Sequence, residues 1–165
     1  MPVAFSLLVL TSRSPAETRR FGKRLSRYLG TGDVVLLEGE LGAGKTCFAQ
    51  GIGKGLRVAE AVKSSSFVLV NEYHGRLKVY HADLFRLSGP DEVGDLALEE
   101  NGADGLLLVE WPDRAAAEMP ADHLRVRFSI EEEKVRRLEV SAHGQRHKEL
   151  LAALVAASQS ADESR

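Results

Sequence analysis

The chain has 165 residues, of which 44% are hydrophobic and 28% are charged, and its formal net charge is −2. This length is typical of one domain with a full core, so we expect a single domain over residues 1–157 and a frayed polar tail over 158–165. The charge provides no bulk basic field for nucleic acid, and we expect no DNA partner. The single cysteine, Cys47, allows no intramolecular disulfide, which indicates a reducing cytoplasm.

The first segment of the chain reads as a strand followed by a helix. Residues 4–10 form an apolar run that is too short to span a membrane and lacks the flanks of a signal peptide, so we expect no membrane partner. Ser14, Pro15 and Glu17 combine the N-cap, first-turn and capping-box signals of a helix start, and Gly30 is a natural stop. The outer face of this helix is basic, with Arg19, Arg20, Lys23, Arg24 and Arg27. We interpret this face as solvated, with contact to RNA or a partner as the alternative.

The next segment combines a buried strand, a glycine-rich loop and a helix. Residues 34–38 read as a parallel strand, and residues 45–56 can form a helix. Between them, Gly39 and Gly44-Lys45-Thr46 have the G-x-x-x-x-G-K-[ST] spacing. The glycines let backbone N–H groups surround phosphate oxygens, while the lysine supplies a charge and the threonine hydroxyl can bind Mg²⁺. Nucleotide binding is therefore the working hypothesis.

The remaining chain alternates strands and helices. Turn signals and periodicity predict a hairpin of residues 67–73 and 77–82, a helix over 91–100, a strand over 106–109, a helix over 113–119, a hairpin of 123–130 and 135–142, and a helix over 145–157. Together these elements predict an α/β fold, a P-loop NTPase-like three-layer sandwich with a mostly parallel central sheet and an antiparallel hairpin near the C-terminus.

Two carboxylates follow predicted strands at the edge where the P-loop lies. Ligands of open α/β sheets bind beyond the carboxyl ends of the strands, and Asp83 and Glu110 occupy such ends. Both can serve a metal-bound triphosphate, and Glu110 could hold a metal water or orient the attacking water. Trp111 could cover the nucleotide, although a core position is favoured. His81 is interpreted as structural or hydrogen-bonded rather than as a general base.

Absent motifs narrow the ligand and leave alternatives open. No Asn-Lys-x-Asp guanine motif occurs, which favours ATP over GTP. A small-molecule kinase is one alternative to an ATPase, and Arg86 and Arg114 are available to it, but no lid-like insertion is present. The second alternative to an ATPase is a nucleotide-gated adaptor without useful catalysis. Cys47 opens the helix and is interpreted as a packed small residue.

Four motifs in order resemble the bacterial TsaE family, also called YjeE. They are Gly39-Glu40-Leu41-Gly42-Ala43-Gly44-Lys45-Thr46, then Ser64-Ser65-Ser66-Phe67, then His81-Ala82-Asp83-Leu84-Phe85-Arg86-Leu87, and Val109-Glu110-Trp111. The P-loop alone is generic, whereas its combination with the later motifs is specific. The second motif stands where the family has a switch-like Ser-Pro-Thr-Phe segment, so that Ser65 replaces the proline.

The resemblance implies an ATPase, slow and stimulated by partners, that uses ATP and Mg²⁺. It would act with the TsaD and TsaB proteins in forming threonylcarbamoyladenosine beside the tRNA anticodon, and tRNA would be reached indirectly through that complex. The implied catalytic residues are Lys45, Asp83 and Glu110, and the implied metal ligands are Thr46, Asp83 and Glu110. The residues expected to bind the nucleotide are Gly39, Glu40, Leu41, Gly42, Ala43, Gly44, Lys45, Thr46, Cys47, Ser66, Trp111 and Arg136.

Overall fold

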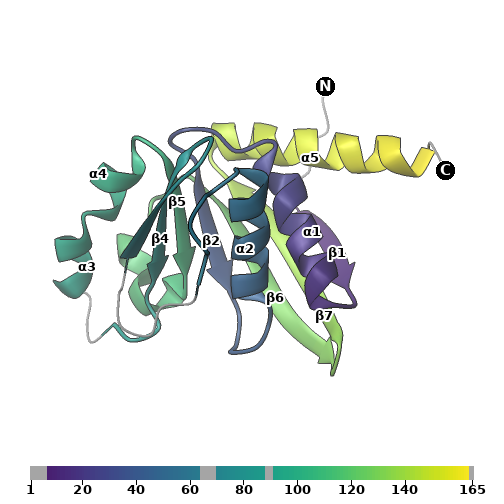
Figure 1. The fold of residues 1–165 in the computed structure, drawn as a ribbon, viewed down its shortest axis with the longest axis horizontal. Helices are drawn as coiled ribbons and strands as arrows, with labels where there is room; N and C mark the ends of the chain where they lie inside the picture. Colours follow the sequence, from purple (N-terminus) through teal and green to yellow (C-terminus); the bar gives the residue numbers. More distant parts are fainter. Residues whose placement is uncertain (1–6, 64–69, 88–90, 164–165) are drawn as a thin grey trace.

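A single seven-stranded sheet carries helices on both faces, as the computed structural model shows for residues 7–63, 70–87 and 91–163 (Figure 1). The strands are β1 (Leu7–Ser12), β2 (Val34–Glu38), β3 (Val70–His74), β4 (Lys78–Asp83), β5 (Leu106–Glu110), β6 (His123–Glu132) and β7 (Val135–His143). The helices are α1 (Pro15–Ser26), α2 (Lys45–Gly55), α3 (Asp91–Leu96), α4 (Leu98–Gly102), the 3₁₀ helix η1 (Pro112–Glu118) and α5 (Gln145–Glu163).

The strand order is β1-β7-β6-β2-β5-β4-β3, with β2 at the centre. Strand β2 pairs in parallel with both β5 and β6, and β5 pairs in parallel with β4. Antiparallel pairs complete both margins, β4 with β3 on one side and β6 with β7 and β1 on the other. The predicted α/β class, the parallel centre and the C-terminal hairpin are confirmed.

Alternation along the central strands divides the core into two layers. In β2, Val35 and Leu37 pack toward α1 and α2, whereas Val34 and Leu36 pack toward α4 and η1. Strand β5 follows the same rule, with Leu108 on the α2 side. Glu110, two residues later, therefore also faces α2. This parity brings a strand-end carboxylate to the helix that follows the P-loop.

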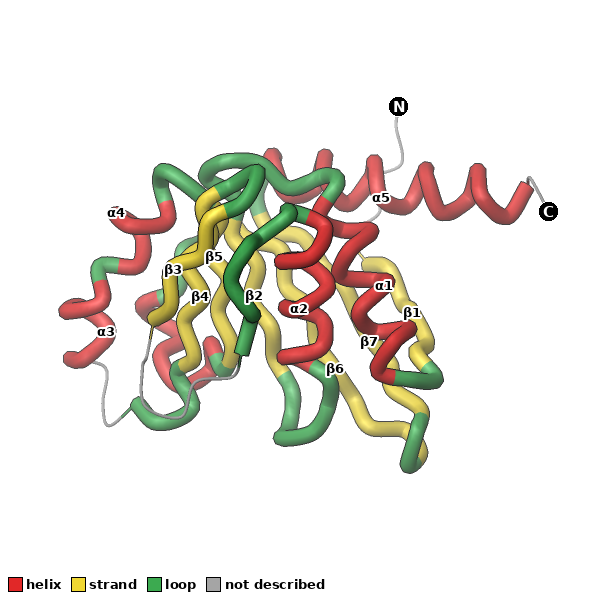
Figure 2. The backbone as a smooth tube through the Cα atoms, viewed as in Figure 1, coloured by secondary structure: helices red, strands yellow, loops and turns green. Residues whose placement is uncertain are grey.

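Helices α1 and α2 lie side by side on one face of the sheet and approach closely (Figure 2). The side chain of Ser14 caps α1 by accepting from the backbone N–H of Glu17 at 3.1 Å, as predicted. A Cβ atom on Gly22 would collide with the carbonyl of Phe48 in α2. A glycine inside α1 therefore allows backbone contact between the two helices.

Several predicted helix boundaries are corrected. Helix α1 ends at Ser26, not near Gly30, because the next N–H groups bond to carbonyls three residues back in a tightened turn. The helix predicted over 91–100 is divided into α3 and α4, because Ala97 adopts a left-handed conformation with φ of 48°. The segment predicted as a helix over 113–119 is the 3₁₀ helix η1.

The ends of the chain also differ from expectation. Strand β1 continues to Ser12, and the predicted starts of the strands over 4–10 and 67–73 lie outside the described residues. Helix α5 is longer than the helix predicted over 145–157 and continues to Glu163. Within that extension, the Ser158 hydroxyl donates to the carbonyl of Leu154 at 3.0 Å. No helix in the described ranges combines the length and the apolar character needed to cross a bilayer.

Helix α5 lies across the end of the sheet opposite the P-loop and is fixed to the start of β2 (Figure 1). The buried imidazole of His147 accepts the backbone N–H of Val34 through Nε2 at 3.1 Å. Beside it, Arg146 makes two hydrogen bonds to the carboxylate of buried Asp33, at 3.0 and 2.9 Å. Burial lowers the pKa of His147 against the opposing effect of Asp33.

Stability should fall as the pH is lowered through the ordinary histidine range. Because the folded pKa of His147 is lowered, the unfolded chain binds a proton below about pH 6.5 before the folded chain does. We therefore expect the free energy of unfolding to fall by up to about 1.4 kcal/mol per pH unit from this group. Urea unfolding between pH 7 and pH 5 measures the effect. The variant His147→Gln, whose side-chain oxygen can accept the same N–H without titrating, should flatten the profile, and parallel profiles would contradict the assignment.

Candidate functional site

The loop between β2 and α2 has the conformation that the glycine spacing predicted. Gly42 and Gly44 have φ of 79° and 108°, a region that favours glycine, and Gly44 is the N-cap of α2. Ala43 between them is fully buried. Helix α2 begins at Lys45 and extends for 11 residues, so its N-terminal N–H groups and its dipole face the loop. The predicted succession of strand, loop and helix is present.

The side chain of Lys45 turns back into this loop. Its ammonium donates to the carbonyls of Gly39 and Glu40, at 2.5 and 2.8 Å, and lies 4.3 Å from the ring centroid of Trp111. The residue is only 5% exposed. A lysine held by carbonyls and an aromatic face is already aimed at the concavity of the loop, where an anion would replace the carbonyl contacts.

Burial lowers the pKa of Lys45, and nearby carboxylates oppose that shift. The largest opposing contributions come from Glu110 and Asp83. The site therefore combines one buried cation with acidic groups across the pocket, which is the charge arrangement that a metal-bound polyphosphate requires.

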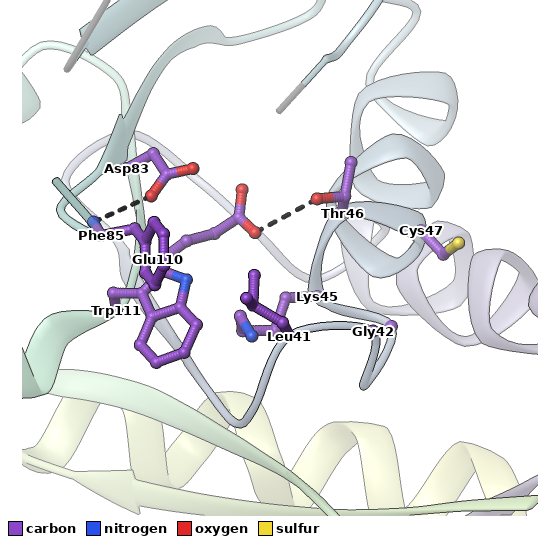
Figure 3. Close-up of a pocket in the computed structure, with 10 residues that line it drawn as sticks. Leu41, Gly42, Lys45, Thr46, Cys47, Asp83, Phe85, Glu110 and Trp111 are labelled. Carbon is purple, nitrogen blue, oxygen red and sulfur yellow. Dashed lines mark hydrogen bonds between the residues drawn. The ribbon is translucent and has the colours of Figure 1, made fainter. Parts of the chain in front are cut away.

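The two predicted carboxylates lie next to each other at the sheet edge. Asp83 and Glu110 are register partners at the ends of the parallel strands β4 and β5. Glu110 Oε1 accepts from the hydroxyl of Thr46 at 3.3 Å, and Asp83 Oδ1 accepts from the backbone N–H of Phe85 at 3.0 Å (Figure 3). The structure thus brings together the three residues expected to serve a metal.

His81 holds the second oxygen of Glu110. The ring Nε2 lies 2.6 Å from Glu110 Oε2, and both side chains are almost completely buried, at 2% and 3% exposure. Among the described residues, the other ring nitrogen has no hydrogen-bond partner. The hydrogen-bonded interpretation of His81 is confirmed, but its partner was not foreseen, because the pairing depends on the register between β4 and β5.

An aromatic pair forms one wall of the pocket. Trp111 has a left-handed backbone with φ of 61°, which turns the chain sharply after β5. Its ring lies 4.9 Å from that of Phe85, and the guanidinium of Arg114 lies 5.6 Å from the indole centroid. Trp111 packs against the core, as favoured, and also lines the pocket, so its contact with a nucleotide stays a prediction. Phe85 was not predicted to form this wall, and Arg114 was not predicted to lie against it.

The pocket collects most of the predicted residues into one place. Its lining comprises Leu41, Gly42, Gly44, Lys45, Thr46, Cys47, Asp83, Phe85, Glu110 and Trp111 (Figure 3). Gly39, Glu40 and Ala43 belong to the loop without lining the pocket. Ser66 lies outside the described residues.

A second cavity lies against the same loop, beside the start of α1. Arg136 of β7 reaches the loop, and its guanidinium donates to the carbonyl of Gly42 at 3.3 Å. Cys47 borders both cavities rather than being packed inside the core. The remaining lining residues of the second cavity are Arg13, Ser14, Pro15, Thr18, Gly44, Glu133 and Lys134. Most of these were not predicted, because the segments are distant in the sequence.

The sheet order, the glycine-rich loop and the helix that follows it define an α/β protein with a P-loop NTPase-like fold. A crystal structure of YdiB from Bacillus subtilis has this fold, with a TM-score of 0.76 and 31% sequence identity. The match covers 92% of the present chain and 96% of YdiB.

Sequence comparisons identify the family. A family model described as "Threonylcarbamoyl adenosine biosynthesis protein TsaE" matches residues 12–138. A protein of Treponema pallidum named tRNA threonylcarbamoyladenosine biosynthesis protein TsaE is 42% identical over 110 residues, or 66% of this chain and 82% of that protein. The protein of the same name from Bacillus subtilis is 35% identical over 139 residues, which cover 83% of this chain and 87% of that protein. The chain therefore belongs to the TsaE family of threonylcarbamoyladenosine biosynthesis proteins.

The buried pair of His81 and Glu110 can be tested by unfolding. Replacing His81 by leucine leaves the Glu110 carboxylate buried without its ring partner, and we expect the free energy of unfolding to fall by about 3 kcal/mol. The double variant His81→Leu/Glu110→Leu removes the buried charge and should recover part of that loss. Urea denaturation measures both variants. A double variant less stable than the single one would contradict a mutual interaction.

Proposed function

We propose that this protein binds and hydrolyses ATP and thereby cycles the machinery that forms threonylcarbamoyladenosine on tRNA. One observation carries the proposal. Lys45 and Thr46 at the start of α2 face Asp83 and Glu110 at the ends of β4 and β5 across one pocket. A cation and a hydroxyl at a P-loop, facing two strand-end carboxylates, are groups that P-loop proteins use to hydrolyse nucleotides.

The phosphates are assigned to the loop between Gly39 and Thr46. Backbone N–H groups of the loop and the start of α2 would bind the phosphate oxygens. Lys45 would exchange its carbonyl contacts for contacts with the outer phosphates, so that an ammonium already removed from water meets charge that develops during transfer. The left-handed backbone turn at Trp111 places the indole beside this ammonium.

The donors present fit Mg²⁺. Thr46 Oγ1 and Glu110 Oε1 are oxygen atoms 3.3 Å apart on the α2 face of the sheet, and Asp83 is the register partner of Glu110. Mg²⁺ is commonly held by one or two carboxylates together with substrate phosphates, and no larger cluster of His, Cys, Asp and Glu occurs in the described ranges. When bound, the ion would neutralise phosphate charge. Glu110, oriented by His81, would orient the attacking water.

The nucleoside is assigned to the second cavity. That cavity adjoins the same loop residues, Gly42 and Gly44, so a nucleotide could extend from one cavity into the other. Arg136 reaches the loop there, and Cys47 lies at the boundary. ATP is preferred to GTP because the guanine motif is absent.

The partners are proposed to be TsaD and TsaB, in the cytoplasm. The family membership supports a role in threonylcarbamoyladenosine formation. In this proposal the ATPase does not transfer phosphate to a substrate of its own. Its turnover times the work of the partner that carries the transfer chemistry.

The first test is Lys45→Ala, which removes the buried ammonium. We expect ATP turnover to fall by about 100-fold or more while the fold is retained, because a preorganised charge at the transferred phosphate is lost. Phosphate release measures turnover, and Lys148→Ala, an exposed lysine on α5, is the matched control. ATP turnover at the wild-type rate by Lys45→Ala would overturn the assignment of this site. Transfer of labelled phosphate from ATP to a metabolite, instead of its release, would favour a kinase.

The second test separates hydrolysis from gating. Glu110→Gln keeps a hydrogen-bonding side chain but removes the carboxylate, so ATP should still bind while hydrolysis falls by about 100-fold. Glu118→Gln, an exposed position in η1, is the control. Equilibrium binding, phosphate release and modification of tRNA with TsaD and TsaB would be measured together. Normal modification by Glu110→Gln would favour the adaptor without useful catalysis.

A further inference from the structure

One side of the molecule carries exposed basic side chains that form no ion pair with the carboxylates that the structure describes. They come from the outer face of α1, the end of α2 and the turn between β3 and β4, and all are exposed. We call them the basic face, which comprises Arg20, Lys23, Arg24, Arg27, Lys54, Arg57 and Arg76. Within the described parts of the chain, none of them forms an ion pair.

Contacts between the three segments make this face continuous. Gly55, next to Lys54 at the end of α2, lies against Ser26 and the carbonyl of Lys23 in α1. The guanidinium of Arg76 donates to the carbonyl of Ser26 at 2.7 Å. Figure 2 shows α1 and α2 side by side on one face of the sheet, so their outer side chains share one surface.

The sheet surface formed by β6 and β7 on the side away from α1 and α2, here called the open sheet face, provides an internal comparison. Strands β6 and β7 also carry arginines there, but Glu38 pairs with Arg125 and Arg127, and Glu139 pairs with Arg137. These three arginines of β6 and β7 are thus paired with carboxylates, whereas the basic face is left with a net positive charge. Basic residues at the end of a helix interact favourably with its dipole, but that effect does not require seven of them.

We propose that the basic face binds the phosphate backbone of RNA. From Arg20 to Arg27 the helix rises by about 10 Å, which is long enough to meet several phosphates of a folded RNA. The large apolar side chains exposed in the described ranges are Leu7, Val9, Leu41 and Ile130, none of them on this face. A protein interface normally has an apolar centre, so RNA fits this surface better than an acidic protein does.

This inference goes beyond the proposed ATPase, because it gives the protein a direct RNA contact where only an indirect one was expected. The basic face includes no residue of the nucleotide pocket. Arg57 follows the C-terminal end of α2, whose N-terminus adjoins the P-loop, and Arg76 donates to Ser26 at the neighbouring end of α1. RNA binding and ATP turnover can therefore be lost separately.

The test is the affinity of the full chain for an unmodified tRNA transcript, measured by fluorescence anisotropy between 50 and 200 mM KCl. The variant Arg20→Gln/Arg24→Gln/Arg27→Gln should bind at least about tenfold more weakly at 100 mM salt, and its slope of log affinity against log salt should fall by about two to three. Glutamine is a helix former comparable with arginine, so α1 should be kept. Circular dichroism of the variant measures whether its helix content is retained.

The matched control is Arg125→Gln/Arg127→Gln/Arg137→Gln, which makes the same change in net charge on the open sheet face. Its affinity should stay within about twofold of wild type. An equal loss of tRNA affinity in both variants would overturn the proposal, because the change in net charge alone would then explain it. Wild-type binding weaker than about 100 µM would also overturn it. So would a basic-face variant that keeps tRNA affinity but loses capture by TsaD and TsaB, since the face would then bind protein.

ATP turnover of the same preparations separates this inference from the proposed function. The basic-face variant should hydrolyse ATP at the wild-type rate and lose only tRNA binding. A wild-type protein that binds tRNA through this face without hydrolysing ATP supports the inference while contradicting the ATPase.

Discussion

The buried carboxylate of Glu110 connects the parts of the site. One oxygen accepts from Thr46 on α2, and the other lies 2.6 Å from the ring of His81 on β4. A carboxylate that is nearly removed from water needs such partners, because an unpaired buried charge is costly. The requirement fixes the spacing of β4, β5 and the start of α2 around the loop. The geometry of the P-loop pocket is therefore tied to a structural interaction of the sheet.

Close packing of α1 on α2 supports the same arrangement from the other side. Glycines at the contact, such as Gly22, let the two backbones approach, and α2 is held with its N-terminus under the loop. Lys45 is then buried with its ammonium inside the loop instead of extending into solvent. Its pKa is lowered by burial, but facing carboxylates favour the charged form that phosphate binding needs.

Charge is segregated in this fold in a way that the net value hides. Residues 91–122, which include α3, α4 and η1, hold many acidic residues and a single basic one, Arg114. The basic face lies on α1 and α2, on the opposite side of the sheet from α4 and η1. The formal charge of −2 therefore hides an uneven distribution of charge along the chain. This is why bulk charge offered no support for RNA contact whereas the folded surface does.

Local constraints allowed the sequence to predict the P-loop and much of the fold. The glycine spacing from Gly39 to Gly44 permits few backbone conformations, and an apolar run before it indicates a buried parallel strand. Because parallel strands end at one edge, the proximity of Asp83 and Glu110 also followed from the sequence. Helix boundaries that depend on one residue with an unusual backbone conformation, such as the break at Ala97, did not follow from the sequence.

Tertiary structure alone decided the contacts between distant side chains. The pairing of His81 with Glu110 follows from strand register, the stack of Phe85 on Trp111 follows from a left-handed turn, and the contact of Arg136 with Gly42 joins segments far apart in the chain. Periodicity shows which face of an element a residue occupies, but not which residue of another element lies opposite it. That information comes from how the elements pack, and it separates a list of candidate residues from a site.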